Sequence, residues 1–488
     1  MSSKKWLITQ IVAIASAGIL ALGVVTPAKA SPSPVTLNFW YFGNVLEPKL
    51  VKMYNALHPE VKIQPKQMDL DALNGQSAIA ACQGVGIAAD IMAIEISYSG
   101  YWRQKPQCFT DLRTLHTSGQ DTAIKRTNGV PQLSGQTYLT QDCASTYDRT
   151  TTFDCIPAGE TANTLKADYL DWRWANGVGN NGSVFGIPTD VGGLQVAYRT
   201  DLFKKAGLPT DRTKVSALWP TWDKFIATGA KYVKTLSAAD RKKNKSFMDN
   251  IGTIYSAILN QGTQKYYSAP TSKDPNGKVV VATNPQVKTA FNTTLQAGTA
   301  GIGSKVGQFS ADWGVGMSNG AFATILAPAW MMDYIKQLAP DTMGKWDIAT
   351  IPGGGGNMGG SQLTIPAGSK NKQAAWDFIS WYLAPAQQLT TFKTYGLFPS
   401  AKNIYDDASI QGYTDPFFNG APVGKIYAAG ATKLKPIFEG MRQRCIDQAM
   451  GSAISLVANA KKDPKGKAYT AATAFPKGLK DAALCQDQ

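Results

Sequence analysis

Histidine is almost absent from this sequence of 488 residues, which contains only His58 and His116. Neither histidine lies near the other or near a suitably spaced cysteine, and no C-x-x-C motif occurs. The common zinc-ligand patterns are therefore excluded. Two histidines also leave few side chains for general acid–base catalysis near neutral pH. We accordingly expect no metal, no cofactor and no catalytic residues.

Long hydrophobic runs are also absent, except at the amino terminus. There two lysines precede an apolar run over residues 7–25, and an A-x-A cleavage site over residues 28–30 stands before Ser31. This pattern predicts a cleaved secretory signal, with an uncleaved membrane anchor as the alternative. Because the first cysteine is Cys82, no lipid-modified export signal is expected. The protein is predicted to act in the periplasm or otherwise outside the cytoplasm.

Cysteine is scarce, and all six cysteines follow the predicted signal. An even number of cysteines favours disulfides in an exported protein, although six cysteines allow fifteen pairings. We predict that neighbours along the chain pair with each other. The predicted disulfides are Cys82–Cys108, Cys143–Cys155 and Cys445–Cys485.

Acidic residues are outnumbered, with 34 Asp and Glu against 49 Lys and Arg. Without the predicted signal the net charge is still +12, since that segment holds three lysines and no acidic residue. An excess of basic residues is compatible with nucleic acids, anionic glycans or membrane surfaces as partners. The basic residues are dispersed, however, and no nucleic-acid module surrounds the densest run, residues 241–245. No nucleic-acid partner is expected.

The chain that follows the signal, about 458 residues, exceeds what one hydrophobic core usually organises, so two or more domains are expected. Residues 35–40 alternate as in a strand, and residues 46–57 carry apolar side chains at helical spacing. Continued alternation of this kind predicts an α/β fold with a mostly parallel sheet flanked by helices. Ligands of such sheets bind beyond the carboxyl ends of the strands. The loop residues at those ends are Tyr41, Phe42, Asn44, Asp69, Asp71, Glu95 and Ser97.

Several motifs follow one another in an order that matches one known family. Near the amino terminus they are residues 38–41 (NFWY), 58–60 (HPE) and 89–92 (ADIM). Further along, the match is strongest over residues 184–208 (VFGIPTDVGGLQVAYRTDLFKKAGL) and 313–399. Together these segments resemble the maltose-binding-type extracellular solute-binding proteins (family 1), the capture subunits of ATP-driven sugar importers.

This resemblance implies a two-lobe periplasmic-binding-protein fold, in which hinge crossings join two sheets that are each flanked by helices. Gly192 and Gly193 would lie in the first crossing, and a third crossing is expected near Pro436. The match is weakest over residues 110–180, where a disulfide-closed insertion is expected, and over 400–488. The implied domains are the signal, 1–30; a discontinuous amino-terminal lobe, 31–194 and 364–435; and a discontinuous carboxy-terminal lobe, 195–363 and 436–488.

The resemblance also implies which residues meet a ligand. Trp330 ends an apolar strand where the family presents an aromatic ring to a sugar, and Asp190 lies at the first crossing, where a carboxylate can accept hydrogen bonds from hydroxyls. A core tryptophan and an ordinary turn aspartate are the alternatives for these two residues. Sugars combine flat C–H faces with a rim of hydroxyls, so their clefts need aromatic rings and polar groups. The candidate ligand-binding residues are Trp40, Tyr41, Asn44, Asp71, Glu95, Asp190, Trp313, Trp330, Gly359, Gly360 and Ser361.

The predicted function is that of a monomeric, extracytoplasmic solute-binding protein. It would capture a sugar or oligosaccharide by hinge closure and deliver it to the permease of an ABC importer. A secreted carbohydrate-active enzyme is one alternative, for which two of Glu95, Asp190 and Asp312 would have to pair as acid and base. A binder of an anionic solute, such as an acidic oligosaccharide or a phosphate ester, is the other, because the net charge of +12 permits it.

Overall fold

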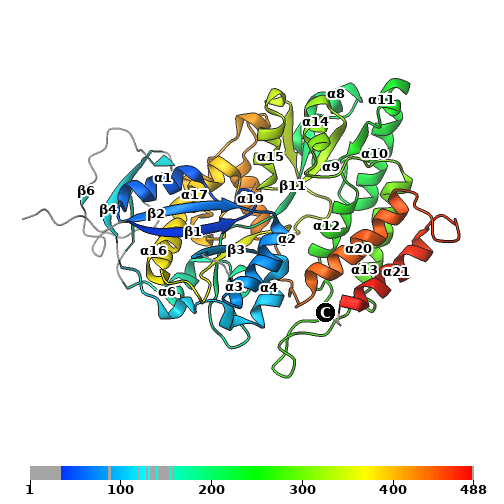
Figure 1. Cartoon of the computed structure of the whole chain (residues 1–488). Coiled ribbons are helices and arrows are strands. Elements are labelled where there is room, and N and C mark those ends of the chain that lie inside the picture. Colours follow the sequence, from blue (N-terminus) through cyan, green and yellow to red (C-terminus); the bar gives the residue numbers. More distant parts are fainter. Residues whose placement is uncertain are drawn as a thin grey trace, which may run out of the picture.

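The protein folds into a mixed α/β structure with two main sheets, and Figure 1 shows this computed structural model. The predicted fold class, two lobes that each contain a sheet and flanking helices, is confirmed. Within the part of the chain that the structure describes, no helix combines the length and the hydrophobicity needed to cross a membrane. The predicted signal, residues 1–30, lies outside that part. The described residues are 34–85, 89–118, 120–127, 130–131, 139–140, 153–156 and 159–485.

The first sheet follows the strand–helix alternation predicted near the amino terminus. Its strand order is β2 (Val61–Gln67), β1 (Val35–Tyr41), β3 (Ile91–Glu95), β13 (Ser361–Thr364), β8 (Gly186–Pro188). β1 pairs in parallel with both β2 and β3, whereas β13 pairs antiparallel with β3 and β8. The carboxyl ends of β1, β2 and β3 therefore meet at one edge of the sheet.

Helix α1 (Pro48–Leu57) illustrates how the helices of this lobe form. The Glu47 side chain accepts a hydrogen bond from the backbone N–H of Lys49, and a proline in the first turn loses no intrahelical bond there. Tyr54 is buried, and its ring meets the Phe378 ring of α16 edge-on with 4.9 Å between the ring centroids. This contact packs α1 against α16. The other helices of this lobe are α2 (Leu70–Ala72), α3 (Ala78–Cys82), α4 (Ile96–Arg103), α6 (Ala162–Leu165), α7 (Asp171–Ala175), α16 (Lys372–Tyr382) and α17 (Pro385–Tyr395).

The second sheet is the core of the other lobe. Its strand order is β10 (Ser246–Met248), β11 (Phe322–Pro328), β9 (Leu194–Arg199), β12 (Trp346–Ala349). Every residue of β9 and β11 is buried, which requires helices on both faces of the sheet. The helices of this lobe are α8 (Thr200–Lys205), α9 (Arg212–Ala217), α10 (Trp222–Thr235), α11 (Ala238–Lys242), α12 (Gly252–Asn260), α13 (Pro285–Thr299), α14 (Ala311–Asn319), α15 (Met331–Leu338), α20 (Gln443–Ala458) and α21 (Ala471–Leu484).

Two crossings between the sheets, residues 189–194 and 356–361, run side by side and pair with each other. The backbone N–H of Thr189 donates to Ser361 O at 2.9 Å, and the N–H of Met358 donates to Gly192 O at 2.8 Å. A Cβ at Gly192 would overlap the Met358 carbonyl, so this close approach requires glycine. The two crossings therefore form a short paired ribbon between the lobes.

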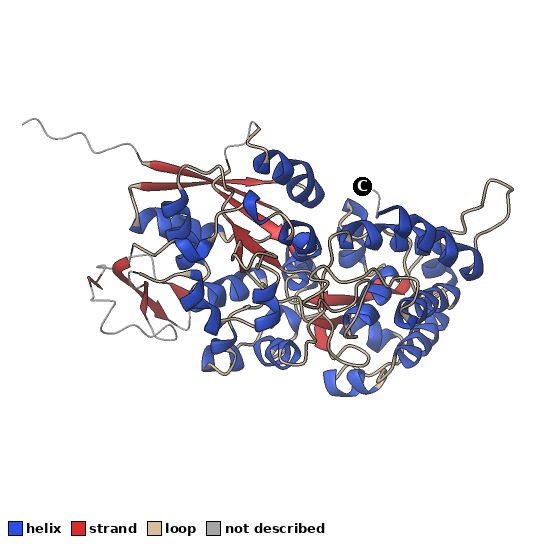
Figure 2. Cartoon of the chain, turned by 90° about the horizontal axis from the view of Figure 1, so that it is seen from below, coloured by secondary structure: helices blue, strands red, loops and turns tan. Residues whose placement is uncertain are grey.

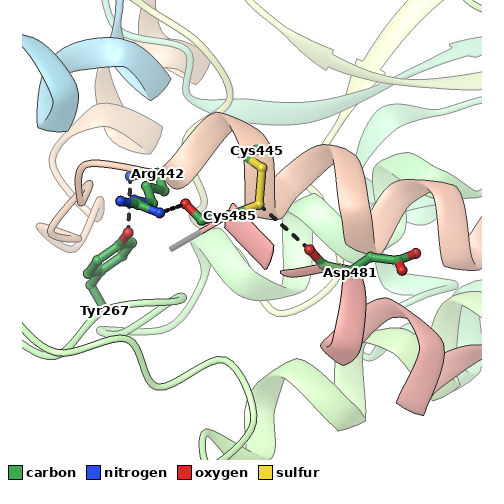
Figure 3. The surroundings of a disulfide bond; sticks show 5 residues. All are labelled: Tyr267, Arg442, Cys445, Asp481 and Cys485. Atoms are coloured by element: carbon green, nitrogen blue, oxygen red, sulfur yellow. Dashed lines mark hydrogen bonds between the residues drawn. A yellow bond between two sulfur atoms is a disulfide. The ribbon is translucent and has the colours of Figure 1, made fainter. Parts of the chain in front are cut away.

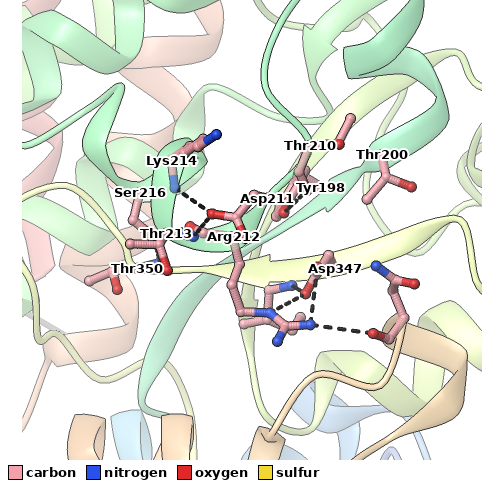
Figure 4. A network of polar contacts seen from close by, with 12 residues as sticks. Tyr198, Thr200, Thr210, Asp211, Arg212, Thr213, Lys214, Ser216, Asp347 and Thr350 are labelled. Carbon is pink, nitrogen blue, oxygen red and sulfur yellow. Dashed lines mark hydrogen bonds and ion pairs between the residues drawn. The ribbon is translucent and has the colours of Figure 1, made fainter.

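Residues 400–431 contact both lobes, so the predicted lobe boundaries stay a prediction. In the first lobe, Ser400 Oγ donates to Pro188 O of β8 at 2.7 Å and Asn403 Nδ2 donates to Asp168 Oδ1 at 3.2 Å. Helix α19 (Val423–Ala431) contacts β9, and its Tyr427 hydroxyl donates to Ala327 O of β11 at 3.2 Å. Arg212 joins the segment before α19 to β12, because its guanidinium donates to the Asp347 carboxylate and to Asn419 O. Figure 4 shows this network. No sequence marker indicates which sheet α18 (Ala408–Gln411) and α19 cover.

Two predicted disulfides are present. Cys82–Cys108 joins the end of α3 to the short helix η2 (Pro106–Cys108), and Cys445–Cys485 joins α20 to the end of α21. Figure 3 shows the surroundings of the Cys445–Cys485 disulfide. There the Arg442 side chain donates a hydrogen bond to Cys485 O, and the backbone N–H of Arg442 donates to the Tyr267 hydroxyl at 3.0 Å. Cys143 lies outside the described residues, so its pairing with Cys155 stays a prediction.

A small antiparallel sheet lies within the region where the sequence predicted an insertion. It projects from the first lobe on the side away from the second lobe, as Figures 1 and 2 show. β4 pairs with each of the other three strands. The strands are β4 (Gln120–Thr127), β5 (Val130–Pro131), β6 (Leu139–Thr140) and β7 (Phe153–Ile156).

Candidate ligand-binding cleft

A cleft of about 1570 Å³ lies between the two lobes. The loops after β1, β2 and β3 line one side, and α12, α20 and the start of α15 line the other. The crossings contribute residues at its floor. Eight of the eleven candidate residues predicted from the sequence line this cleft: Asn44, Asp71, Glu95, Asp190, Trp330, Gly359, Gly360 and Ser361.

Trp330 forms part of an aromatic wall of the cleft. It follows the buried strand β11 and precedes α15, so the predicted strand-to-helix junction is confirmed. Its indole Nε1 donates to Met358 O at 3.0 Å, and its ring is half-buried. The Phe309 ring stacks at 6.4 Å with an interplanar angle of 24°, and the Tyr334 ring meets Trp330 edge-on at 5.9 Å. Phe309 is 54% exposed, so the wall presents open aromatic surface.

The other three candidate residues lie elsewhere. Trp313 is fully buried in the core of the second lobe, and its Nε1 donates to Asp249 Oδ2 at 3.0 Å. Trp40 lies outside the cleft with the Lys66 ammonium 4.4 Å from its ring centroid. Tyr41 contacts the Phe39 ring edge-on and is also not a cleft residue.

Asp190 ties the two crossings together at the floor of the cleft. Its Oδ1 accepts hydrogen bonds from Thr189 Oγ1 at 2.6 Å and from the Ser361 N–H at 2.9 Å. The buried Arg173 guanidinium donates to Asp190 O and to Ser361 O, and so bridges both crossings. Burial raises the pKa of Asp190, while the Arg173 charge and these hydrogen bonds oppose that rise.

An ion pair crosses the cleft between the lobes. Arg444 on α20 donates to both carboxylate oxygens of Asp71, at 3.0 and 2.9 Å, and the Tyr98 hydroxyl donates to the same carboxylate at 2.7 Å. Burial alone would raise the pKa of Asp71, but these hydrogen bonds outweigh it and the pKa lies below its ordinary value. Asn44 makes a second contact between the lobes, since its Nδ2 lies 3.4 Å from Asp333 Oδ2.

More charged groups gather beside this ion pair. Lys265 is almost fully buried and lies 3.1 Å from Asp447 Oδ1. The Glu95 carboxylate accepts a hydrogen bond from the Ser97 N–H at 2.8 Å, and Glu439 is buried nearby. All four of these charged residues line the cleft. Among the described residues, no group of three or more His, Cys, Asp or Glu side chains is arranged to hold a metal ion.

A family comparison matches residues 49–418 to the bacterial extracellular solute-binding proteins. The chain belongs to this family. The resemblance inferred from the sequence is thereby confirmed, and membership places this solute-binding protein outside the cytoplasm.

Two curated relatives of this solute-binding protein match parts of it. The arabinooligosaccharide-binding protein of Bacillus subtilis (strain 168) is 24% identical over 270 residues, which are 53% of this chain and 59% of that protein. The lactose-binding protein of Rhizobium radiobacter is 27% identical over 207 residues, 41% of this chain and 45% of that protein. The matches therefore span about half the length of these relatives.

Solved structures match nearly the whole solute-binding protein. A crystal structure described as extracellular solute-binding protein family 1 is 29% identical, with a TM-score of 0.70 over 93% of this chain and 100% of that one. A transporter-associated binding protein from B. animalis subsp. lactis, in complex with β-1,6-galactobiose, is 19% identical, with a TM-score of 0.66 over 93% of this chain and 96% of that one. At that lower identity the likeness supports the fold alone.

Several residues that line the cleft of this solute-binding protein were not predicted from the sequence. They come from segments without a recognisable motif, and they meet only because α12, α20 and the segment before α20 converge. The one available signal was the expected third crossing near Pro436, because polar residues just after a crossing lie close to the cleft. The missed residues include Tyr255, Lys265, Phe309, Glu439, Arg444 and Asp447.

Replacing Asp190 by alanine should loosen the paired crossings. The change leaves the buried Ser361 N–H without its acceptor and the Arg173 charge without its neighbouring carboxylate. We expect the free energy of unfolding to fall by about 1–3 kcal/mol. Urea denaturation of the ligand-free protein measures this, with Asp190→Asn as the control that keeps an acceptor oxygen. Equal stability of Asp190→Ala and the wild type would contradict the role assigned to this carboxylate.

Proposed function

We propose that this protein binds a sugar or oligosaccharide in the cleft and delivers it to an ABC-type importer, without catalysing a reaction. The observation that carries the proposal is the aromatic wall of Phe309, Trp330 and Tyr334 in a cleft that also contains carboxylates and amides. Aromatic faces suit the C–H faces of a sugar, and the polar groups suit its hydroxyls. The cleft exceeds the roughly 300–1,000 Å³ of most small-ligand sites, which favours an oligosaccharide.

The relatives named for arabinooligosaccharide and lactose binding support a carbohydrate ligand. Two of the cations that line the cleft, Lys265 and Arg444, are already paired with carboxylates, which favours a neutral ligand over an anionic one beside them. We further propose that the protein acts as a monomer, without a nucleic-acid partner.

The enzyme alternative has less support. Asp312 is exposed in the first turn of α14 and does not line the cleft, while Asp190 is engaged with Thr189 and Ser361. Residues 316–320 read G-x-S-x-G, a pattern that hydrolases place at a strand-to-helix turn. Here the pattern lies at the end of helix α14, and Ser318 donates to Asp341 Oδ1 at 2.8 Å.

Export would remove residues 1–30 and leave Ser31 as an amino terminus without a lipid. We propose this from the signal pattern and from the position of the first cysteine. The intact mass of the exported protein measures it. A mass that retains the segment, or that carries an acyl increment, would overturn this part of the proposal.

A thermal-shift panel tests the binding of carbohydrates. The panel contains arabinotriose, lactose, β-1,6-galactobiose and maltotriose, with trigalacturonate and glucose 6-phosphate as anionic probes. A neutral oligosaccharide at a hundred times its Kd should stabilise the protein by about 2.7 kcal/mol and raise its melting temperature. Stabilisation by the anionic probes alone would establish the anionic-solute alternative, and stabilisation by none of the probes would remove the support for carbohydrate binding.

Trp330→Ala should weaken binding of the stabilising sugar at least tenfold, because truncation of an aromatic anchor typically costs 2 kcal/mol or more. The melting temperature of the ligand-free protein should fall by less than for a fully buried tryptophan, since the Trp330 ring is only half-buried. Titration calorimetry and melting curves measure both effects.

Trp313→Phe is the matched control for this measurement. Because Trp313 is fully buried, its change should lower the melting temperature and leave the affinity unaltered. A loss of affinity in Trp313→Phe but not in Trp330→Ala would move the sugar-stacking role to Trp313.

A further inference from the structure

Glu439 lies in the segment between α19 and α20, and it lines the cleft. The backbone around it is held firmly against α4 of the other lobe. A Cβ at Gly100 would overlap the Gly440 carbonyl, so the backbone of α4 touches the backbone of the segment before α20. Arg103 donates from Nη1 to Glu439 O at 3.2 Å, and its guanidinium lies 4.7 Å from the Phe438 ring centroid. The backbone at Glu439 is therefore held in place, and the residue is only 7% exposed.

The neighbouring carboxylates have partners within the protein. Asp447 pairs with Lys265, Asp71 pairs with Arg444, and Glu95 accepts from Ser97. Glu439 differs from them. Among the cleft-lining carboxylates that the structure describes, only Glu439 has a buried oxygen, Oε2, without a hydrogen-bond donor. Burying an acceptor without a donor is costly, so a donor from outside the chain would be favoured here.

We propose that Glu439 is a specificity-determining ligand contact whose carboxylate accepts a hydrogen bond from a hydroxyl of the bound sugar. The inference rests on the proposed carbohydrate function. An ionised carboxylate is an acceptor only, so it selects a ligand that places a donor at this point. Lys265 and Arg103 already supply positive charge near Glu439, which favours a neutral hydroxyl over a cationic ammonium group.

The contact makes binding depend on pH. Burial raises the pKa of Glu439 to about 7; Lys265 and Arg103 lower it, and Asp447 and Glu95 raise it. Near neutral pH the ligand-free protein is thus a mixture of the acid and the carboxylate. A hydroxyl that donates to Glu439 stabilises the carboxylate, so the pKa falls on binding and a proton is released. The affinity consequently rises with pH, about tenfold for each unit by which binding lowers the pKa.

Titration calorimetry at pH 5.5 and pH 8.5 tests the proposal, with the neutral oligosaccharide of the panel that raises the melting temperature. The wild type should bind about tenfold more tightly at pH 8.5. Glu439→Gln keeps the shape of the side chain but does not titrate, so its affinity should be the same at both pH values and several-fold weaker than that of the wild type at pH 8.5. Asp249→Asn is the control, because the pKa of Asp249 is about 6 but its side chain contacts Gln308 and Trp313 within the second lobe and does not line the cleft. This variant should keep the full pH dependence.

Proton release is measured on the wild type alone, from binding enthalpies in buffers of different ionisation enthalpy, and so needs no variant to fold. Release of a proton near pH 7, absent in Glu439→Gln, supports the proposal. A wild-type affinity that does not change with pH, or an unaltered pH dependence in Glu439→Gln, would overturn it. A panel in which no sugar binds would instead remove the proposed function itself, so the two failures are distinct.

Discussion

The backbone pairing of residues 189–194 with residues 356–361 is the constraint on which the rest of the structure depends. These crossings are the ends of strands from both sheets, so their register sets how the lobes face each other. Asp190 and Arg173 fix that register from within, because each contacts both crossings. Both charged side chains are buried and make hydrogen bonds to the crossings, and leaving a buried charge without such partners costs several kcal/mol. These two side chains therefore hold the floor of the cleft together.

Above that floor, the two lobes bring different chemistry to the cleft. The first lobe supplies polar loop residues at the carboxyl ends of parallel strands, such as Asn44 and Glu95. The second lobe supplies the aromatic wall at Trp330 and the buried charges around Lys265. A ligand that presents both an apolar face and hydroxyls satisfies both lobes only when it lies between them. The division of chemistry thus couples ligand binding to the relative position of the lobes.

Local pattern was enough to predict the first strands, α1, the crossings and Trp330, because each depends on residues close together in the sequence. Distant partners could not be predicted in this way. Asp71 was expected to meet a ligand, yet its carboxylate is engaged by Arg444, 373 residues away. Trp313 and Trp330 looked alike as aromatic residues near β11, but only the packing of α14 shows that Trp313 is buried. Likewise, the apolar face of α19 would fit either sheet.

The ion pair between Asp71 and Arg444 raises the question of whether it could hold the lobes together without a ligand. Its side chains are 46% and 38% exposed, and an exposed pair of this kind contributes about 0.2–1 kcal/mol. A ligand that binds one arrangement of the lobes a hundredfold more tightly than another shifts their equilibrium by about 2.8 kcal/mol. The pair is therefore too weak to decide the position of the lobes. Arg444 precedes Cys445, whose disulfide ties α20 to α21, so the backbone that carries this side chain is anchored at the cleft edge. The pair thus orients Asp71 at the edge of the cleft.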